Sequence, residues 1–360
     1  MNAPSTQTSL GTLHVGAGLD FGPLTVFPVW TDAPVARGIS TATTADIQVT
    51  ELDPPTVPRL IAWHNLDHDV LLLEGTMLVG GNQTRVAACD VLIPRGERLV
   101  IDVRCVEAGR WHGGHRYGVD GKVPASVKVA LRGGSRRGAP ADQSEVWAKV
   151  ARLERSYGAK PTSSLHEVLN DSLAMSEFKN LDEGDRRQAM AAERRKRAQA
   201  GVGSFAGVRA DDEQSFGSDI PGVDAEVLER LRHFAKHPLP GQRGIIIGIG
   251  GVPVSLEMYA SAAACRAELL STLMAALVDA GSIRYVGPTR GQAARNFAAN
   301  VVKASWIVDV VGGAAATQGA SETVRGGDEF IDIRALQRSD TKTLLHFSAL
   351  NMQHELALAL

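Results

Sequence analysis

The sequence lacks most of the features that mark a specialised protein class. Only three of its 360 residues are cysteines, Cys89, Cys105 and Cys265, and no Cys-x-x-Cys pair is present. This scarcity excludes a disulfide framework and a zinc site built from cysteines, and it favours a reducing compartment. Stability must therefore come from a packed core, which a chain of this length is long enough to form.

An excess of one charge is also missing. There are 38 Lys and Arg against 40 Asp and Glu, a net charge of −2, so nothing attracts the whole chain to nucleic acid or to an anionic membrane. No stretch reaches the ~18 consecutive apolar residues of a membrane span. The first thirty residues hold neither Lys nor Arg, unlike a secretory signal. We therefore expect a cytoplasmic protein with no membrane segment and no nucleic-acid partner.

What the sequence does contain is 44% hydrophobic residues in two successive patterns. At roughly 150 residues per domain, the length corresponds to about two domains, or to one large domain with a helical annex. Residues 10–135 show short apolar runs about ten residues apart, such as 24–30, 59–63 and 99–103, with turn residues between them. Because no helical pattern separates these runs, they predict an antiparallel β region built as a sandwich or a barrel.

The pattern changes after this region. Residues 140–175 have helical spacing, with capping-box signatures at Asp142 with Glu145 and at Ser163 or Ser164 with Glu167. Residues 176–219 are charged and then rich in Gly and Ser, which predicts an exposed helix followed by a partly disordered linker that could dock a protein partner. Residues 220–350 predict an α+β region that completes the domain, with a hairpin at Gly250-Gly251 and a helix from about 262 to 279. The fold class is α+β, with a helix-plus-hairpin C-terminal half.

The candidate site lies in the β region. If Gly80-Gly81 forms a turn, Gln83 and Arg85 share one face of a strand beside Glu74. Glu107, Arg110 and Trp111 follow the next long strand. Arginine side chains can bind phosphate or carboxylate through paired hydrogen bonds, Glu107 or Glu74 can act as general acid or base, Gln83 can orient a ligand, and Trp111 can stack on it. The alternative is a buried structural ion pair at the sheet end, with Trp111 in the core.

A family resemblance follows from three pieces of this sequence. The segments 72–85 (Leu-Leu-Glu-Gly-Thr-Met-Leu-Val-Gly-Gly-Asn-Gln-Thr-Arg) and 98–111, ending in Cys-Val-Glu-Ala-Gly-Arg-Trp, resemble the ARG-and-rhodanese-phosphatase-superfamily-associated protein domain family, as does the helix start 143–147. The hairpin at 244–258 and the following helix are similar to its second half, so the resemblance spans roughly 10–347. The motif residues here are Glu74, Gln83, Arg85, Cys105, Glu107, Arg110 and Trp111.

The resemblance implies a role near ADP-ribose or NAD-derived nucleotides, because the family name records an association with ADP-ribosylglycohydrolases and phosphatases. We therefore expect a protein that binds, and as an enzyme would hydrolyse, an ADP-ribose-like or other phosphorylated nucleotide metabolite. No cofactor is specified. One alternative is a noncatalytic interaction protein that uses residues 176–219. Another is a metal-dependent hydrolase that uses His64, His68, His112 and His115, since imidazoles beside carboxylates can bind metal.

Overall fold

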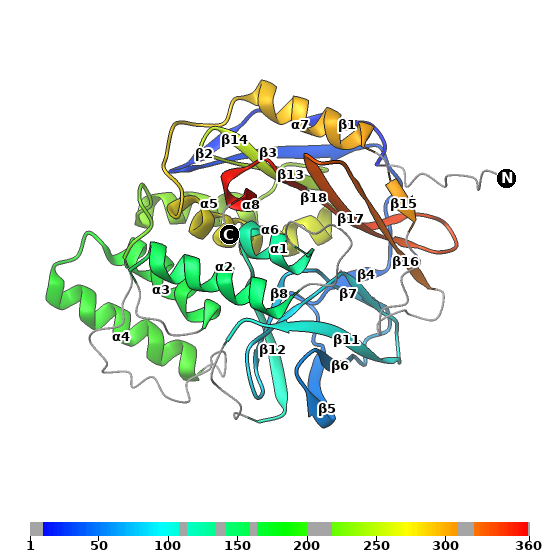
Figure 1. Ribbon diagram of the computed structural model, residues 1–360, viewed down its shortest axis with the longest axis horizontal. Helices are drawn as coiled ribbons and strands as arrows, with labels where there is room; N and C mark the ends of the chain where they lie inside the picture. Colours follow the sequence, from blue (N-terminus) through cyan, green and yellow to red (C-terminus); the bar gives the residue numbers. More distant parts are fainter. Residues whose placement is uncertain are drawn as a thin grey trace.

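The computed structural model describes residues 10–107, 114–133, 142–158, 164–199, 218–304, 306–308 and 320–358. Within them the chain forms a large antiparallel sheet, a closed barrel and a small three-stranded sheet, which helices join into one body (Figure 1). The predicted α+β class, with a β-rich N-terminal half and a helix-plus-hairpin C-terminal half, is confirmed. None of the described helices combines the length and apolar character needed to cross a membrane.

The nine-stranded sheet unites the beginning and the end of the described chain. Its order is β1-β3-β13-β14-β18-β17-β16-β15, with β2 also paired to β3. The strands are β1 (Leu13–Val15), β2 (Leu19–Phe21), β3 (Leu24–Thr31), β13 (Gly244–Ile249), β14 (Val252–Tyr259), β15 (Trp306–Val308), β16 (Ser321–Gly327), β17 (Ile331–Arg338) and β18 (Leu344–Asn351). The predicted β13–β14 hairpin turns at Gly250 and Gly251, whose φ values of 60° and 83° favour glycine.

The side chains of β13 point alternately to the two faces of this sheet, and helices cover both faces. Ile245, Ile247 and Ile249 contribute to one hydrophobic cluster and Ile246 to another, as expected for a strand buried on both faces. Helix α7 (Gly291–Lys303) covers the Ile246 face. Helices α5 (Ala225–Lys236) and α6 (Ala262–Gly281) cover the other face, and α6 lies between the sheet and the barrel (Figure 1). Helix α6 matches closely the helix predicted from about 262 to 279.

The barrel is formed by chain from the N-terminal half. It closes in the order β11-β6-β5-β12-β8-β9, and its inward side chains form a separate core. Its strands are β5 (Gln48–Thr56), β6 (Arg59–Trp63), β8 (Thr76–Gly80), β9 (Arg85–Ala87), β11 (Arg98–Cys105) and β12 (Arg116–Lys122). The small sheet, β10-β7-β4, comprises β4 (Ile39–Thr41), β7 (Asp69–Leu72) and β10 (Val91–Ile93). Its β4–β7 pair is parallel, unlike the antiparallel pairing predicted for this region.

The remaining described helices are α1 (Ala125–Leu131), α2 (Gln143–Ser156), α3 (Leu165–Phe178), α4 (Glu183–Gln199) and α8 (Glu355–Leu358). The β region predicted for residues 10–135 was wrong for α1, which packs against α2 and α6. Asp142 caps α2 by accepting a hydrogen bond from the Ser144 amide. Ser164 begins α3, but its side chain does not form the predicted cap. Region 10–135 thus divides between the large sheet, the small sheet, the barrel and α1.

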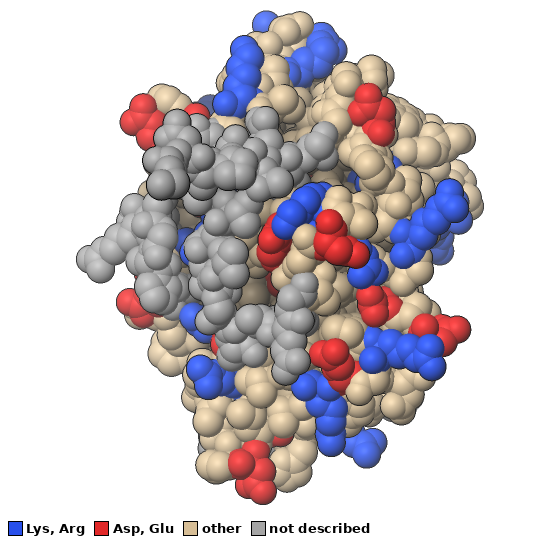
Figure 2. Space-filling view, turned by 90° about the vertical axis from the view of Figure 1, so that its right-hand side faces the viewer, with Lys and Arg blue, Asp and Glu red and all other residues tan. Residues whose placement is uncertain are grey.

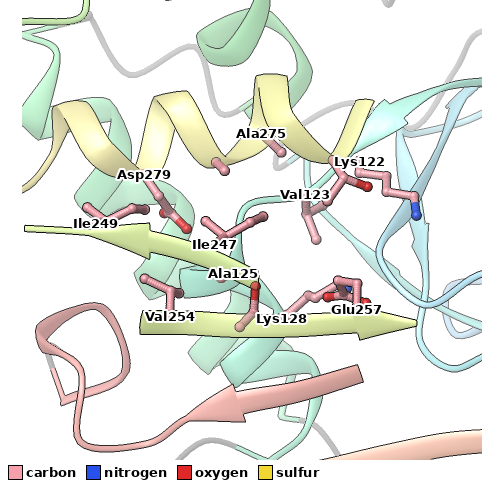
Figure 3. A pocket seen from close by; sticks show the side chains of 13 residues that line it. Lys122, Val123, Ala125, Lys128, Ile247, Ile249, Val254, Glu257, Ala275 and Asp279 are labelled. Carbon is pink, nitrogen blue, oxygen red and sulfur yellow. The ribbon is translucent and has the colours of Figure 1, made fainter. Parts of the chain in front are cut away.

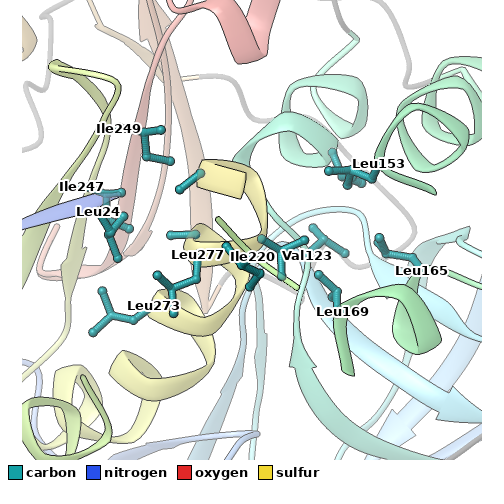
Figure 4. Packing of buried hydrophobic residues seen from close by; sticks show 14 of the residues in the cluster. Leu24, Val123, Leu153, Leu165, Leu169, Ile220, Ile247, Ile249, Leu273 and Leu277 are labelled. Carbon is teal, nitrogen blue, oxygen red and sulfur yellow. The ribbon is translucent and has the colours of Figure 1, made fainter. Parts of the chain in front are cut away.

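The largest core cluster has α6 at its centre (Figure 4). Leu273 and Leu277 of α6 are fully buried and face Ile247 and Leu24 of the sheet, while Val123 and Leu169 approach from the barrel side. Burial on both sides makes α6 the layer that holds the sheet and the barrel together.

Leu277→Ala is expected to lower the free energy of unfolding by about 2–5 kcal/mol, because it leaves a cavity where neighbouring side chains cannot collapse. Chemical denaturation followed by circular dichroism would measure the change. Leu358→Ala is the matched control, since Leu358 is 64% exposed on α8 and should change stability by less than about 0.5 kcal/mol. Equal effects from the two variants would contradict the central role of α6.

Candidate functional site

Two of the predicted site residues meet inside one end of the barrel. Arg85 is fully buried, and its Nη1 donates a hydrogen bond to Gln83 Oε1. Glu51 Oε1 lies 4.0 Å from Arg85 Nη2 and accepts a hydrogen bond from the Tyr117 hydroxyl. Burial and this bond to Glu51 raise the pKa of Tyr117. The arginine that was expected to hold phosphate therefore faces protein carboxylate and amide groups.

Glu107 lies just beyond this barrel end. It is 5% exposed, its Oε2 accepts a hydrogen bond from the Thr84 amide at 2.8 Å, and its backbone pairs with Ser164 at the start of α3. Cys105 donates its thiol hydrogen bond to the Glu107 carbonyl, and burial raises the pKa of that thiol, which disfavours a nucleophilic thiolate. These contacts tie the β11 end to the helices.

The other motif positions and the histidines are less informative. Arg110, Trp111 and His112 lie outside the described residues. His64 is buried against the Ile93 carbonyl, and His68 contacts Asp67 and Ser40. Over the described part of the chain, no three His, Cys, Asp or Glu side chains are grouped to hold a metal ion.

Glu74 belongs to a different cluster, between the barrel, α1 and the large sheet. Its Oε2 accepts hydrogen bonds from Arg132 Nε and Nη2 at 2.9 and 2.6 Å, and its Oε1 accepts one from Arg334 Nη1 at 2.8 Å. Burial opposes ionisation, but Arg132 and Arg334 outweigh it and lower the pKa of Glu74. A carboxylate fixed on both oxygens is structural, so Glu74 is not placed for proton transfer.

The Glu74 cluster continues through a buried histidine. His346 Nδ1 lies 2.8 Å from Asp90 Oδ2, and its Nε2 lies 3.2 Å from Glu257 Oε2. Burial alone would lower the pKa of His346, yet the charges of Asp90 and Glu257 raise it, which favours the imidazolium form. Lys128 of α1 binds the other Glu257 oxygen at 2.8 Å. Asp332 Oδ1 lies 3.0 Å from Arg132 Nη1. We call this set the interlayer network: Glu74, Asp90, Lys128, Arg132, Glu257, Asp332, Arg334 and His346.

The face drawn in Figure 2 shows no cluster of charged side chains as dense as the interlayer network in the part that the structure describes. There, basic and acidic side chains are interspersed over the described part of the face. This pattern agrees with the net charge of −2.

A cavity of about 380 Å³ lies between β12, α3 and α6. Its size is at the lower end of the ~300–1,000 Å³ typical of small-molecule sites. None of the motif residues described above lines it. The lining residues are Thr43, Met77, Val119, Asp120, Gly121, Lys122, His166, Leu169, Asn170, Leu173, Ala267, Leu270, Ser271, Met274 and Ala275. Apolar walls with a few polar groups are the usual composition of a ligand site.

The polar groups converge on one wall of this cavity. His166 Nε2 lies 2.5 Å from Asp120 Oδ2, and the Asn170 amide donates to the His166 carbonyl at 2.9 Å. The His166 side chain is 4% exposed, whereas that of Asp120 is 39% exposed. A carboxylate that is accessible from the cavity and oriented by a buried imidazole can accept a proton from water or from a ligand hydroxyl.

Sequence reasoning missed this pair. His166 and Asn170 are four residues apart on a helix that the sequence predicts, so their common face was readable. The position of Asp120 could not be predicted from the sequence, because β12 lacks a clear strand pattern. It includes Gly118 and Gly121 and a register irregularity after Val119. The pairing of Asp120 with His166 joins positions 46 residues apart.

Glu167, which follows His166 in α3, has a raised pKa. Burial and the nearby carboxylates of Asp171 and Glu107 raise the pKa of Glu167 to about 7. Asp171 itself is held by Arg194 and Arg197 of α4 at 2.5 and 3.1 Å, which anchors α4 to α3. Within 176–219 the structure thus describes the end of α3, α4 and residues 218–219, while 200–217 lie outside it.

Glu74→Gln is expected to lower the free energy of unfolding by about 3–5 kcal/mol, because Arg132 and Arg334 would remain buried without their carboxylate. Denaturant titration at neutral pH would measure this loss. Glu183→Gln is the control, since it removes an exposed i,i+4 pair with Arg187 and should cost less than about 1 kcal/mol. A Glu74→Gln effect no larger than the control would contradict the structural role.

Glu167→Gln is expected to stabilise the protein by about 1–2 kcal/mol at pH 8, since one pKa unit is worth about 1.4 kcal/mol and solvent screens part of it. A pKa raised to about 7 in the folded protein means that stability falls as pH rises through 7, whereas below the ordinary value of 4.5 both states are protonated. Melting temperatures from pH 4 to 8 should therefore diverge only above about pH 5. The exposed Glu229→Gln control should show no such divergence.

Comparison with known families agrees with the motifs read from the sequence. The model of the ARG and Rhodanese-Phosphatase-superfamily-associated Protein domain matches residues 12–210, more than half of the chain. The C-terminal part that the sequence resemblance included lies outside this match. No curated protein and no solved structure matches the chain. On the evidence of residues 12–210, the chain belongs to the family of ARG and Rhodanese-Phosphatase-superfamily-associated Protein domains.

Proposed function

We propose that the protein binds an ADP-ribose-like or other nucleotide-derived metabolite in the cavity between β12, α3 and α6. The observation that carries this proposal is the Asp120–His166 pair on the wall of a cavity of about 380 Å³. Leu169, Leu173 and Met274 offer apolar surface to a base or sugar ring. Asp120 and Asn170 offer hydrogen-bonding groups to ribose hydroxyls.

The reaction that this arrangement supports best is hydrolysis. Asp120 would accept a proton from the attacking water, whose oxygen bonds to the ribosyl carbon while the glycosidic bond breaks and its electron pair leaves with the base. His166 would hold the Asp120 carboxylate in place. The family association with an ADP-ribosylglycohydrolase-related superfamily supports the same substrate class. β12 and α3, which carry Asp120 and His166, lie within the matched residues 12–210, whereas α6 lies outside them.

This proposal relocates the site that the sequence motif suggested. Gln83 and Arg85 contact each other inside the barrel, and Glu74 is engaged by two arginines. We assign Arg85 to the framework that supports the cavity wall, because Arg85 pairs in register with Leu78 of β8, and Leu78 pairs with Val119 of β12.

Ala267→Phe is expected to weaken ligand binding at least about tenfold, because the new ring would occupy the cavity from α6. Calorimetric titration with ADP-ribose, NAD and adenosine would measure affinity, and product release from the same ligands would measure hydrolysis. Ala263→Phe is the matched control, since Ala263 is exposed on the same helix and does not line the cavity.

The proposal would be lost if the wild-type protein bound none of these ligands, or if Ala263→Phe and Ala267→Phe reduced binding equally. Binding without product release would retain the ligand site and remove the hydrolase assignment.

A further inference from the structure

The charges around the cavity limit which ligands it can hold. Lys122 is the only Lys or Arg among the described residues that line it. Its Nζ lies 2.7 Å from Glu268 Oε2, and the two side chains are 3% and 1% exposed. A phosphate that took Lys122 as its partner would leave Glu268 buried without a counter-charge, which is costly. Lys122 therefore serves as the counter-ion of Glu268 and not as a phosphate ligand.

The small chamber next to Lys122 adds no unpaired positive charge among its described lining residues. A small chamber of about 20 Å³ shares Lys122 and Ala275 with the cavity and has room for about one water molecule. Figure 3 shows Lys128 and Glu257 together on its wall, and their charged atoms are 2.8 Å apart. Asp279 faces the same chamber, and burial raises its pKa to about 6. Every described lysine of the chamber thus has a carboxylate partner.

The same strand also brings negative charge to the cavity. Asp120 is the most accessible ionisable group described there, with 39% of its side chain exposed. The first turn of α3 has a positive helix dipole that would attract an anion, but it carries Glu167, which offsets that attraction. Met77 and Met274 add polarisable sulfur, which packs well against flat rings.

We propose that the cavity selects an uncharged nucleoside or a positively charged pyridinium riboside, and that it excludes the phosphate groups of a larger nucleotide. Asp120 attracts the cationic ring or the ribose hydroxyls, while any phosphate remains at the cavity mouth. This inference rests on the proposed function, because it names the part of the metabolite that the cavity receives.

The test is calorimetric titration of the full chain at low salt with nicotinamide riboside, its uncharged reduced form and nicotinamide mononucleotide. The cationic riboside should bind most tightly, and its 5′-phosphate at least about tenfold more weakly. Asp120→Asn should weaken binding of the cationic riboside at least about fivefold more than binding of the reduced form, because both lose the carboxylate as a ribose partner but only the cation loses its counter-charge. Glu183→Gln, which removes an exposed carboxylate on α4, should change none of these affinities.

The outcomes separate the two proposals. If nicotinamide mononucleotide binds as tightly as the riboside, or if Asp120→Asn leaves the preference for the cation unchanged, the charge selectivity is overturned and the ligand site stands. If none of the three probes and no ADP-ribose binds, both proposals are overturned.

Discussion

The fold depends on the two ion pairs that Arg132 and Arg334 form with the buried carboxylate of Glu74. Glu74 comes from the chain between β7 and β8, Arg132 from the end of α1, and Arg334 from the large sheet, so one carboxylate joins three layers. His346 and Glu257 extend the interlayer network to β14 and β18. Ion pairs in such surroundings require matched partners and fixed geometry, since each unpaired charge would be strongly destabilising. They therefore fix the relative position of layers that apolar contacts alone could allow to slide.

The candidate ligand cavity follows from this arrangement. Its walls are β12 of the barrel, α3 beside it and α6 beneath the sheet, and no one of these elements could form it alone. Lys122 stands where the cavity meets the small inner chamber, and its bond to Glu268 of α6 joins the barrel to the helix. The residues that would contact a ligand and the residues that hold the layers together are thus neighbours on the same strand.

The sequence predicted those elements whose signals are local. The β13–β14 hairpin depends on Gly250 and Gly251, and the start of α6 depends on Ser261, whose side chain caps Ala264. Helix α1 was not predictable, because its apolar run suits a strand equally well and the partners of Lys128 and Arg132 lie far along the chain. The contact of Gln83 with Arg85 followed from their spacing, but the approach of Glu51 and Tyr117 depended on barrel closure. Asp120 and His166 required a tertiary structure to be brought together.

The pairing of β3 with β13 also has a consequence for biosynthesis. β3 leaves the ribosome more than 200 residues before β13, so the edge of β3 that pairs with β13 stays open after β1 and β2 have paired with its other edge. A strand that waits in this state is an edge open to pairing with other chains. This edge of β3 is completed only when translation passes Ile249, whereas the barrel strands all precede Val123 and can pair long before the sheet is complete.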